Sequence, residues 1–195
     1  KQEIHTIKRV NNIRRSLNMS GKAIGKTLDI GYAGTVSRSQ DCIISNKPVN
    51  SESEEIMFGQ AVVLNADNTI SKIKDGDTAD KFLGIAVREV KQTTNYLTSA
   101  GSYLPESPAD ILERGTVAVK CNNGTPTAGG KVYVRVAINE EISTGVIGEF
   151  EAEADEETVE ESKVARTLEL PNVVFATGKI DANGITEVKI LNRNI

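Results

Sequence analysis

The residue types that could carry nucleophilic or acid–base chemistry are sparse in this chain of 195 residues. It has one histidine, His5, and two cysteines, Cys42 and Cys121, which form no CxxC pair. A Ser-His-Asp or Cys-His arrangement would have to be built on His5, and a zinc site needs several Cys or His ligands at close spacing. We therefore expect no catalytic residues, no metal site and no cofactor. A hydrolase that uses two of the many carboxylates is the enzymatic alternative, because such a pair is defined by its separation in space.

The segment SGKAIGKT, residues 20–27, has a partial likeness to a phosphate-binding loop. That motif needs a glycine five positions before its Gly-Lys-Ser/Thr triplet, but position 20 is serine and Gly21 stands one residue late. No apolar strand precedes the segment either. We expect a flexible turn here and no bound nucleotide.

The formal net charge of −4 hides a segregation of charge along the chain. Residues 1–38 hold eight basic and two acidic residues, a balance of +6, so the remainder carries −10. No aromatic residue precedes Tyr32, whereas proteins that bind single strands stack bases on aromatic side chains. We expect the basic segment to dock on an acidic protein surface, with a phosphate backbone or an uncommitted flexible tail as alternatives. The candidate partner-binding residues are Lys8, Arg9, Arg14, Arg15, Lys22, Lys26 and Arg38.

The opposite charge is concentrated in EFEAEADEETVEE, residues 149–161, which holds eight acids in thirteen positions. Like charges at this density repel one another, so we expect a solvated excursion between strands rather than part of the core. A calcium loop would need acids at the offsets of DxDxDG with a tight-turning glycine, and this segment has neither.

A change of pattern divides the chain into an N-terminal arm, residues 1–31, and a β-rich body, residues 32–195. In the arm, apolar residues recur every three positions from Ile4 to Ile13, which permits a short helix over residues 6–17 or, equally, an extended conformation. The body shows strand and turn patterns without a sustained helical period.

The body's strand patterns are specific enough to place. Two hairpins are predicted, over residues 59–77 and 173–191, the second closed by Asn183-Gly184. KFLGIAVREVKQ predicts a half-buried strand with one apolar face, and residues 93–110 predict a long loop. Further strands are expected at 115–121 and 131–138. The predicted fold is mainly β: a small β-sandwich or β-barrel body with an extended basic N-terminal arm and an acidic loop insertion.

The longest apolar runs are far shorter than the roughly 20 residues that a membrane helix needs, and the start of the chain has no signal-peptide pattern. We expect a soluble protein that binds no membrane. Two isolated cysteines favour a reducing compartment. Because the first residue is lysine, either a preceding stretch is missing from this numbering or a protease has cut the chain.

Several segments of the body resemble the bacteriophage structural cement proteins, the capsid decoration proteins on the outer face of tailed-phage heads. Gly31-Tyr32-Ala33-Gly34 resembles the start where such chains enter the folded body. The segments that carry the resemblance are FGQAVVLNADNTISKIKDGDTADKFLGIAVREVKQ (58–92), ERGTVAVKC (113–121), GGKVYVRV (129–136) and FATGKIDANGITEVKI (175–190).

This resemblance implies a non-enzymatic virion protein, made in the bacterial host cytoplasm and attached to the outer capsid surface. It implies that the major capsid protein and other copies of the chain are the partners, commonly as a homotrimer that bridges neighbouring capsomers. Such a bridge would stabilise the shell against DNA packing pressure. The alternative function is a nucleic-acid-binding β-barrel that uses the basic N-terminal arm.

Overall fold

The structure is a computed structural model that describes residues 29–88, 101–140, 142–159 and 162–192. Its regular structure is almost entirely β, which confirms the predicted class. Within these ranges no helix has the length and apolarity to cross a membrane. The predicted helix or extended conformation over residues 6–17 lies outside them.

The elements are β1 (Val36–Pro48), β2 (Ile56–Met57), β3 (Ala61–Leu64), β4 (Ile70–Lys72), η1 (Ala79–Lys81), β5 (Phe82–Ala86), β6 (Ser102–Tyr103), β7 (Pro108–Lys120), β8 (Lys131–Arg135), β9 (Phe150–Glu151), β10 (Glu156–Val159), β11 (Ser162–Ala165), β12 (Thr167–Phe175) and β13 (Ile185–Ile190).

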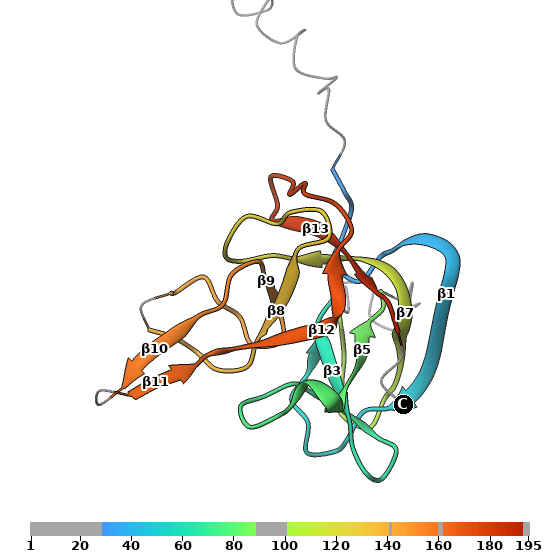
Figure 1. The fold of residues 1–195 in the computed structure, drawn as a ribbon. Helices are drawn as coiled ribbons and strands as arrows, with labels where there is room; N and C mark the ends of the chain where they lie inside the picture. Colours follow the sequence, from blue (N-terminus) through green and yellow to red (C-terminus); the bar gives the residue numbers. More distant parts are fainter. Residues whose placement is uncertain (1–28, 89–100, 141, 160–161, 193–195) are drawn as a thin grey trace, which may run out of the picture.

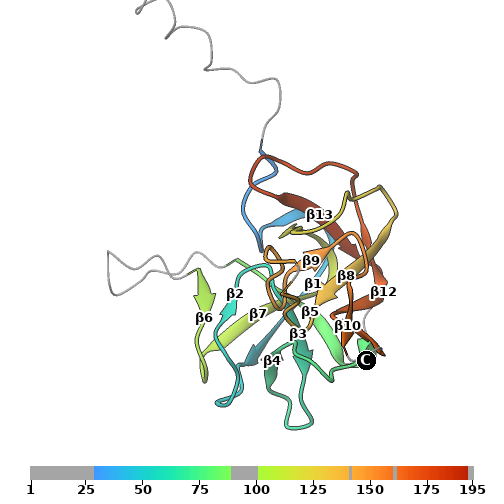
Figure 2. The same cartoon turned by 90° about the vertical axis from the view of Figure 1, so that its left-hand side faces the viewer.

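In the described part of the chain, nine strands form one curled antiparallel sheet, a half-barrel (Figures 1 and 2). Their order is β4-β3-β5-β7-β13-β12-β8-β9, and β1 pairs with β7 outside this path. β7 therefore has strands on both edges, with β1 on one and first β5, then β13, on the other. Gly115 lies where the neighbour changes, with a φ of 128° that L side chains rarely adopt. This glycine lets the longest central strand bend as the sheet curls.

Two clusters of buried apolar side chains hold the sheet together. The larger is built mainly from β5, β7, β8, β12 and β13, and the smaller from β2, β3, β5, β6 and β7. β5 contributes to both, with Phe82 and Ile85 in the larger cluster and Leu83 and Ala86 in the smaller. The prediction of a half-buried strand is therefore wrong, because β5 is an interior strand covered on both faces.

The first predicted hairpin is confirmed. β3 and β4 pair antiparallel, from Val62 opposite Lys72 to Leu64 opposite Ile70. The turn between them contains Asn68 at a φ of 66°, a left-handed conformation that asparagine tolerates better than most residues.

The closing hairpin is also confirmed, with different bounds. β12 ends at Phe175, so the prediction of a strand through residues 176–180 is wrong. The connection is instead organised by Asp181, whose Oδ1 accepts hydrogen bonds from the backbone N–H groups of Asn183 and Ile185, each at 2.9 Å. The strands predicted at 115–121 and 131–138 correspond to β7 and β8, but β7 already begins at residue 108 and β8 ends at residue 135.

The predicted long loop over residues 93–110 is wrong in its second half, because Tyr103 is drawn into the core. Ser102–Tyr103 forms β6 and pairs with β2, with Tyr103 opposite Ile56. The buried Tyr103 hydroxyl donates a hydrogen bond to the carbonyl oxygen of Val87 at 2.8 Å. Its ring meets that of Phe58 edge-on, with centroids 5.2 Å apart. Residues 93–100 lie outside the described residues.

Candidate interaction surfaces

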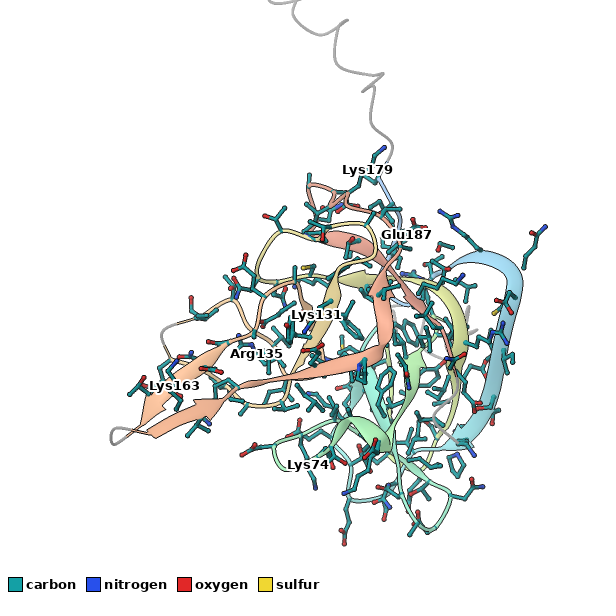
Figure 3. All side chains as sticks on the ribbon, viewed as in Figure 1. Lys74, Lys131, Arg135, Lys163, Lys179 and Glu187 are labelled. Carbon is teal, nitrogen blue, oxygen red and sulfur yellow. The ribbon has the colours of Figure 1, made fainter. Side chains whose placement is uncertain are left out.

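The β10–β11 hairpin projects from the curled sheet, at the left of Figure 1. Across the described ranges its two strands pair only with each other, with Glu156 opposite Ala165 and Thr158 opposite Lys163. These four side chains and that of Val164 are exposed, and Figure 3 shows Lys163 far from the core. The hairpin is thus a two-stranded ribbon open to solvent.

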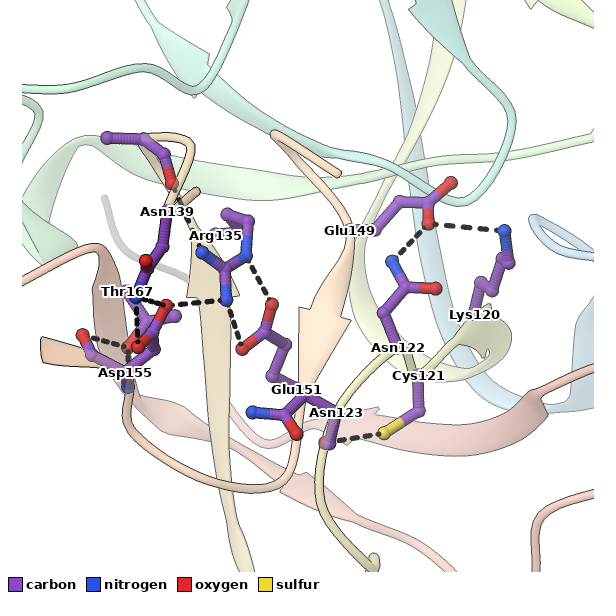
Figure 4. Close-up of polar contacts among 11 residues, drawn as sticks. Lys120, Cys121, Asn122, Asn123, Arg135, Asn139, Glu149, Glu151, Asp155 and Thr167 are labelled. Atoms are coloured by element: carbon purple, nitrogen blue, oxygen red, sulfur yellow. Dashed lines mark hydrogen bonds and ion pairs between the residues drawn. The ribbon is translucent and has the colours of Figure 1, made fainter. Parts of the chain in front are cut away.

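A buried ion-pair cluster lies at the root of this hairpin (Figure 4). Nη2 of Arg135, on β8, lies 3.0 Å from Oε2 of Glu151 and 2.8 Å from Oδ2 of Asp155. The exposed fractions of the three side chains are 0%, 0% and 5%. Asn139 donates from Nδ2 to both carboxylate oxygens of Asp155, at 2.9 and 3.1 Å. The cluster therefore joins β8, β9 and the residue that precedes β10.

The cluster is held together by charge. Burial by itself would lower the pKa of Arg135, but the hydrogen bonds and charges of Glu151 and Asp155 outweigh burial and raise it. The guanidinium therefore keeps its positive charge, and the two carboxylates share it. A Cβ atom on Gly145 would lie 2.0 Å from Nε of Arg135, so the absence of a side chain at Gly145 lets the backbone pass close to the guanidinium. Removing one partner of such a buried pair typically costs about 3–5 kcal/mol.

Backbone hydrogen bonds complete the root. The N–H of Arg166 donates to the carbonyl oxygen of Asp155 at 2.9 Å, and the N–H of Val136 donates to the carbonyl oxygen of Arg166 at 3.0 Å. The N–H of Asp155 donates to Oγ1 of Thr167 at 2.8 Å. Both strands of the hairpin are thereby fixed to the body where they leave it.

The prediction that residues 149–161 form a solvated excursion is wrong for the first half of that segment. Phe150 and Glu151 form strand β9 and are fully buried, and Asp155 is buried as well. The acids enter the interior because Arg135 supplies their counter-charge. The sequence does carry a signal for β9, since acidic and apolar residues alternate with period two from 149 to 155. No comparable signal marks Arg135, whose strand reads as an ordinary alternation with one solvent-facing side.

Only one of the predicted partner-binding residues lies within the described residues. Arg38, on β1, has a side chain that is 63% exposed, and its Nη2 lies 3.8 Å from Oε2 of Glu187 on β13. An exposed pair at this distance contributes little stability, so Arg38 is available to a partner. The others, Lys8, Arg9, Arg14, Arg15, Lys22 and Lys26, lie outside the described residues.

Arg38 lies beside a bulge in β1. Arg38 pairs with Thr116 and Ile43 with Arg114, so four residues of β1 lie opposite one residue of β7. Asp41 in the bulge has a φ of 62°, and its Oδ1 lies 3.0 Å from Nη2 of Arg114. The bulge opens a groove of about 520 Å³ on this edge of the sheet. Bulges and charged side chains of this kind discourage unspecific edge-to-edge pairing.

The chain enters the body along a fixed path. The N–H of Ile30 donates to Oδ2 of Asp181 at 3.1 Å, and the N–H of Gly34 donates to the carbonyl oxygen of Ala118 at 2.8 Å. Between them, the ring centroid of Tyr32 lies 4.5 Å from Cζ of Arg88, a cation–π contact. The point from which residues 1–28 depart is therefore held against the closing hairpin.

These features define a class, an all-β protein built on one curled sheet with a projecting hairpin and a fixed N-terminal entry. The family model described as structural cement protein (E217 gp24/Pam3 gp6) matches residues 21–191. The chain belongs to this phage structural cement protein family, which confirms the resemblance seen in the sequence. It is accordingly a structural component of a phage virion that associates with capsid proteins.

The search of solved structures gives a fold relative with little sequence similarity. A chain from a structure titled "The capsid of Myoviridae Phage XM1" aligns with a TM-score of 0.59 at 17% identity. The alignment covers 91% of this chain and 99% of that one, so the two share their fold over nearly their whole lengths. Among the curated proteins, none matches.

Proposed function

We propose that this protein is a decoration protein that binds the outer surface of the assembled head as a homotrimer and bridges neighbouring capsomers of the major capsid protein. The bridge stabilises the shell against the pressure of packed DNA, without catalysis. The observation that carries the proposal is the match of the cement protein family to residues 21–191.

The stabilisation comes from many weak contacts that act together. When DNA fills the head, pressure pulls neighbouring capsomers apart, and a bridging protein resists by adding binding free energy across the seam. A single interface of standard size can be only micromolar. Three linked subunits act at a high effective concentration, which raises avidity by roughly 10² to 10⁴.

The seven predicted basic residues supply part of this binding. The body has a net negative charge, so it would repel an acidic protein surface. The basic segment before residue 39 has the opposite charge and can bind such a surface. Arg38 extends the basic surface onto the folded body, where 63% of its side chain is exposed.

The proposal is tested by adding the purified protein to heads that lack it. We expect saturable co-sedimentation with the heads, density for three clustered copies at capsomer junctions in an image reconstruction, and a higher temperature of DNA release. Failure to bind would overturn the proposal. If the protein binds but the temperature of DNA release is unchanged, the proposed stabilising role is wrong and only the attachment to heads is supported.

A further inference from the structure

We propose that the β10–β11 hairpin is the docking surface for the basic N-terminal segment, residues 1–28, of a neighbouring copy of the chain. This inference rests on the proposed function, because it specifies how copies on one head contact one another. It is carried by the hairpin's exposure, its fixed root and the charge and apolar character of both partners.

Within the described residues, the β10–β11 hairpin lacks the additional strand or covering layer that normally stabilises a two-stranded ribbon. A two-stranded ribbon without a third strand or a covering layer is marginally stable in water. Here Glu156, Thr158, Lys163 and Ala165 are exposed on one face of the ribbon and Val164 on the other, and the two strands have free outer edges across the described ranges. An extended segment can add to such an edge through main-chain hydrogen bonds, with side chains supplying specificity.

The contacts at the base of the hairpin hold it in its exposed position. Arg135 holds Asp155 through a 2.8 Å ion pair, and the backbone of Arg166 is bonded to both Asp155 and Val136. The ribbon therefore cannot fold back onto the sheet without breaking a buried ion pair. A surface held in place before binding loses less conformational entropy when a partner docks.

The two proposed partners are complementary in charge. Residues 149–166 contain eight acids and two bases, a balance of −6, but three of the acids, Glu149, Glu151 and Asp155, pair with Lys120 and Arg135 outside the ribbon. Residues 1–28 contain seven bases and one acid, a balance of +6. On the hairpin, Glu156 pairs with Lys163 and Glu157 with Arg166. Residues 156–166 contain four acids and two bases, so the hairpin itself has a balance of −2.

Apolar side chains match as well. Val164 on β11 is 36% exposed, and Ile138, in the loop that follows β8 near the root, is 65% exposed. The N-terminal segment carries isoleucine or valine at every third position from Ile4 to Ile13. The isoleucines and valine of the basic segment can pack on these exposed aliphatic side chains, while its basic residues face the acidic ones.

A neighbouring copy is the occupant that the geometry favours. The chain enters the body at Ile30, beside the closing hairpin, whereas the β10–β11 hairpin projects from another side of the body (Figure 1). An extended segment of 28 residues spans at most about 100 Å, so an adjacent subunit is within reach. Donating one segment and accepting another is a head-to-tail contact, which closes a ring in a cyclic oligomer.

A pair of matched variants of the full chain tests the charge contribution. Glu156 and Lys163 form one exposed ion pair at 3.2 Å, so Glu156→Lys and Lys163→Glu each break the same contact and leave two like charges. They change the net charge of the ribbon in opposite directions. In sedimentation at low salt, Glu156→Lys should weaken self-association about fivefold and Lys163→Glu should strengthen it by a similar factor. Equal effects of both variants, or no self-association of the wild type, would overturn the inference.

Cross-linking identifies the occupant. Light and ¹⁵N-labelled full-length chains are mixed and treated with a carbodiimide, which joins lysines to carboxylates. We expect light–heavy peptide pairs that link residues 1–28 to residues 149–161. Links found only within light or only within heavy chains would show that the segment docks on its own body, contrary to the inference. Attachment to heads is measured separately, so a wild-type protein that binds heads but shows no light–heavy link between residues 1–28 and residues 149–161 overturns this inference and leaves the proposed function standing.

Discussion

The side chains of Arg135 and Asp155 meet inside the body, with Nη2 of Arg135 2.8 Å from Oδ2 of Asp155. Arg135 ends β8, and Asp155 is the residue before β10, so one buried ion pair connects the curled sheet to the projecting hairpin. Glu151, paired with the same guanidinium, brings β9 into the contact. The stability of the body and the position of the hairpin therefore depend on one arginine.

Replacing Arg135 by methionine should destabilise the protein by about 3–5 kcal/mol, because two buried carboxylates lose their counter-charge. Lys131→Met is the matched control, since Lys131 lies on the same strand with a side chain 68% exposed and pairs with the exposed Glu169. The control should change the free energy of unfolding by less than about 1 kcal/mol. Urea titrations followed by circular dichroism measure both, and similar losses for the two variants would contradict the assignment.

Gly84→Ala should be strongly destabilising. A Cβ atom at this position would lie 2.1 Å from the carbonyl oxygen of Leu112, so β5 and β7 would have to separate. Overpacking of this kind costs about 1–3 kcal/mol or more. Gly101→Ala is the control, because its Cβ would meet only the flexible end of Met57, at 3.9 Å. Thermal unfolding should show a lower melting temperature for Gly84→Ala alone.

Asp181 should make the closing hairpin sensitive to acid. Burial acts to raise the pKa of Asp181, but hydrogen bonds from the N–H groups of Ile185, Asn183 and Ile30 outweigh it and lower the pKa below its ordinary value of 3.8. A carboxylate with a lowered pKa stabilises the fold above its unfolded-state pKa, and this contribution disappears as the pH falls through the folded-state value.

The change that tests this is Asp181→Asn. Between pH 5 and pH 2.5 or thereabouts, the wild type should lose more stability than the variant, because the variant has no carboxylate to protonate at this position. Denaturant titrations at several pH values, normalised to pH 7, measure the difference. Parallel profiles for the two proteins would show that Asp181 contributes nothing to the acid dependence.

The two thiols should react slowly and in order. Burial raises the pKa of both Cys42 and Cys121, with the charge of Asp41 adding to the effect at Cys42. Thiolate is the reactive form, so both are poor nucleophiles at neutral pH. Cys42 is partly exposed and Cys121 is buried, so a maleimide should modify Cys42 first and Cys121 only after unfolding. A Cys42→Ser variant assigns the two phases, and a fast phase that survives it would contradict the prediction.

Attachment to heads should depend on salt. Exposed charges are screened over about 8–10 Å at physiological ionic strength, so binding through the basic segment should weaken as salt rises. Arg14→Glu with Arg15→Glu should reduce co-sedimentation with heads, whereas the control, Lys131→Glu with Lys179→Glu, makes the same charge change at exposed positions of the body. Equal losses in both double variants would indicate a general charge effect without a role for these arginines.

Sequence patterns were sufficient for the features that depend on local chemistry. Turn residues between apolar alternations located the β3–β4 and β12–β13 hairpins, since Asn68 and Gly184 accept positive φ where most residues are strained. The motifs at 58–92, 113–121, 129–136 and 175–190 indicated the cement protein family. The segregation of charge between the basic residues 1–38 and the acidic residues 149–161 is likewise a property of the sequence alone.

The tertiary structure decided what depends on which strands become neighbours. β5 is buried on both faces because β3 and β7 flank it and two apolar clusters form. The continuous apolar run from Phe82 to Val87 is compatible with this burial, but only the neighbouring strands decide that both faces are covered. Glu151 and Asp155 are buried because the pairing of β8 with β9 brings them to Arg135, 16 and 20 residues earlier in the sequence. Charge density predicted solvent for this segment, since a local pattern cannot reveal a counter-charge supplied by another strand.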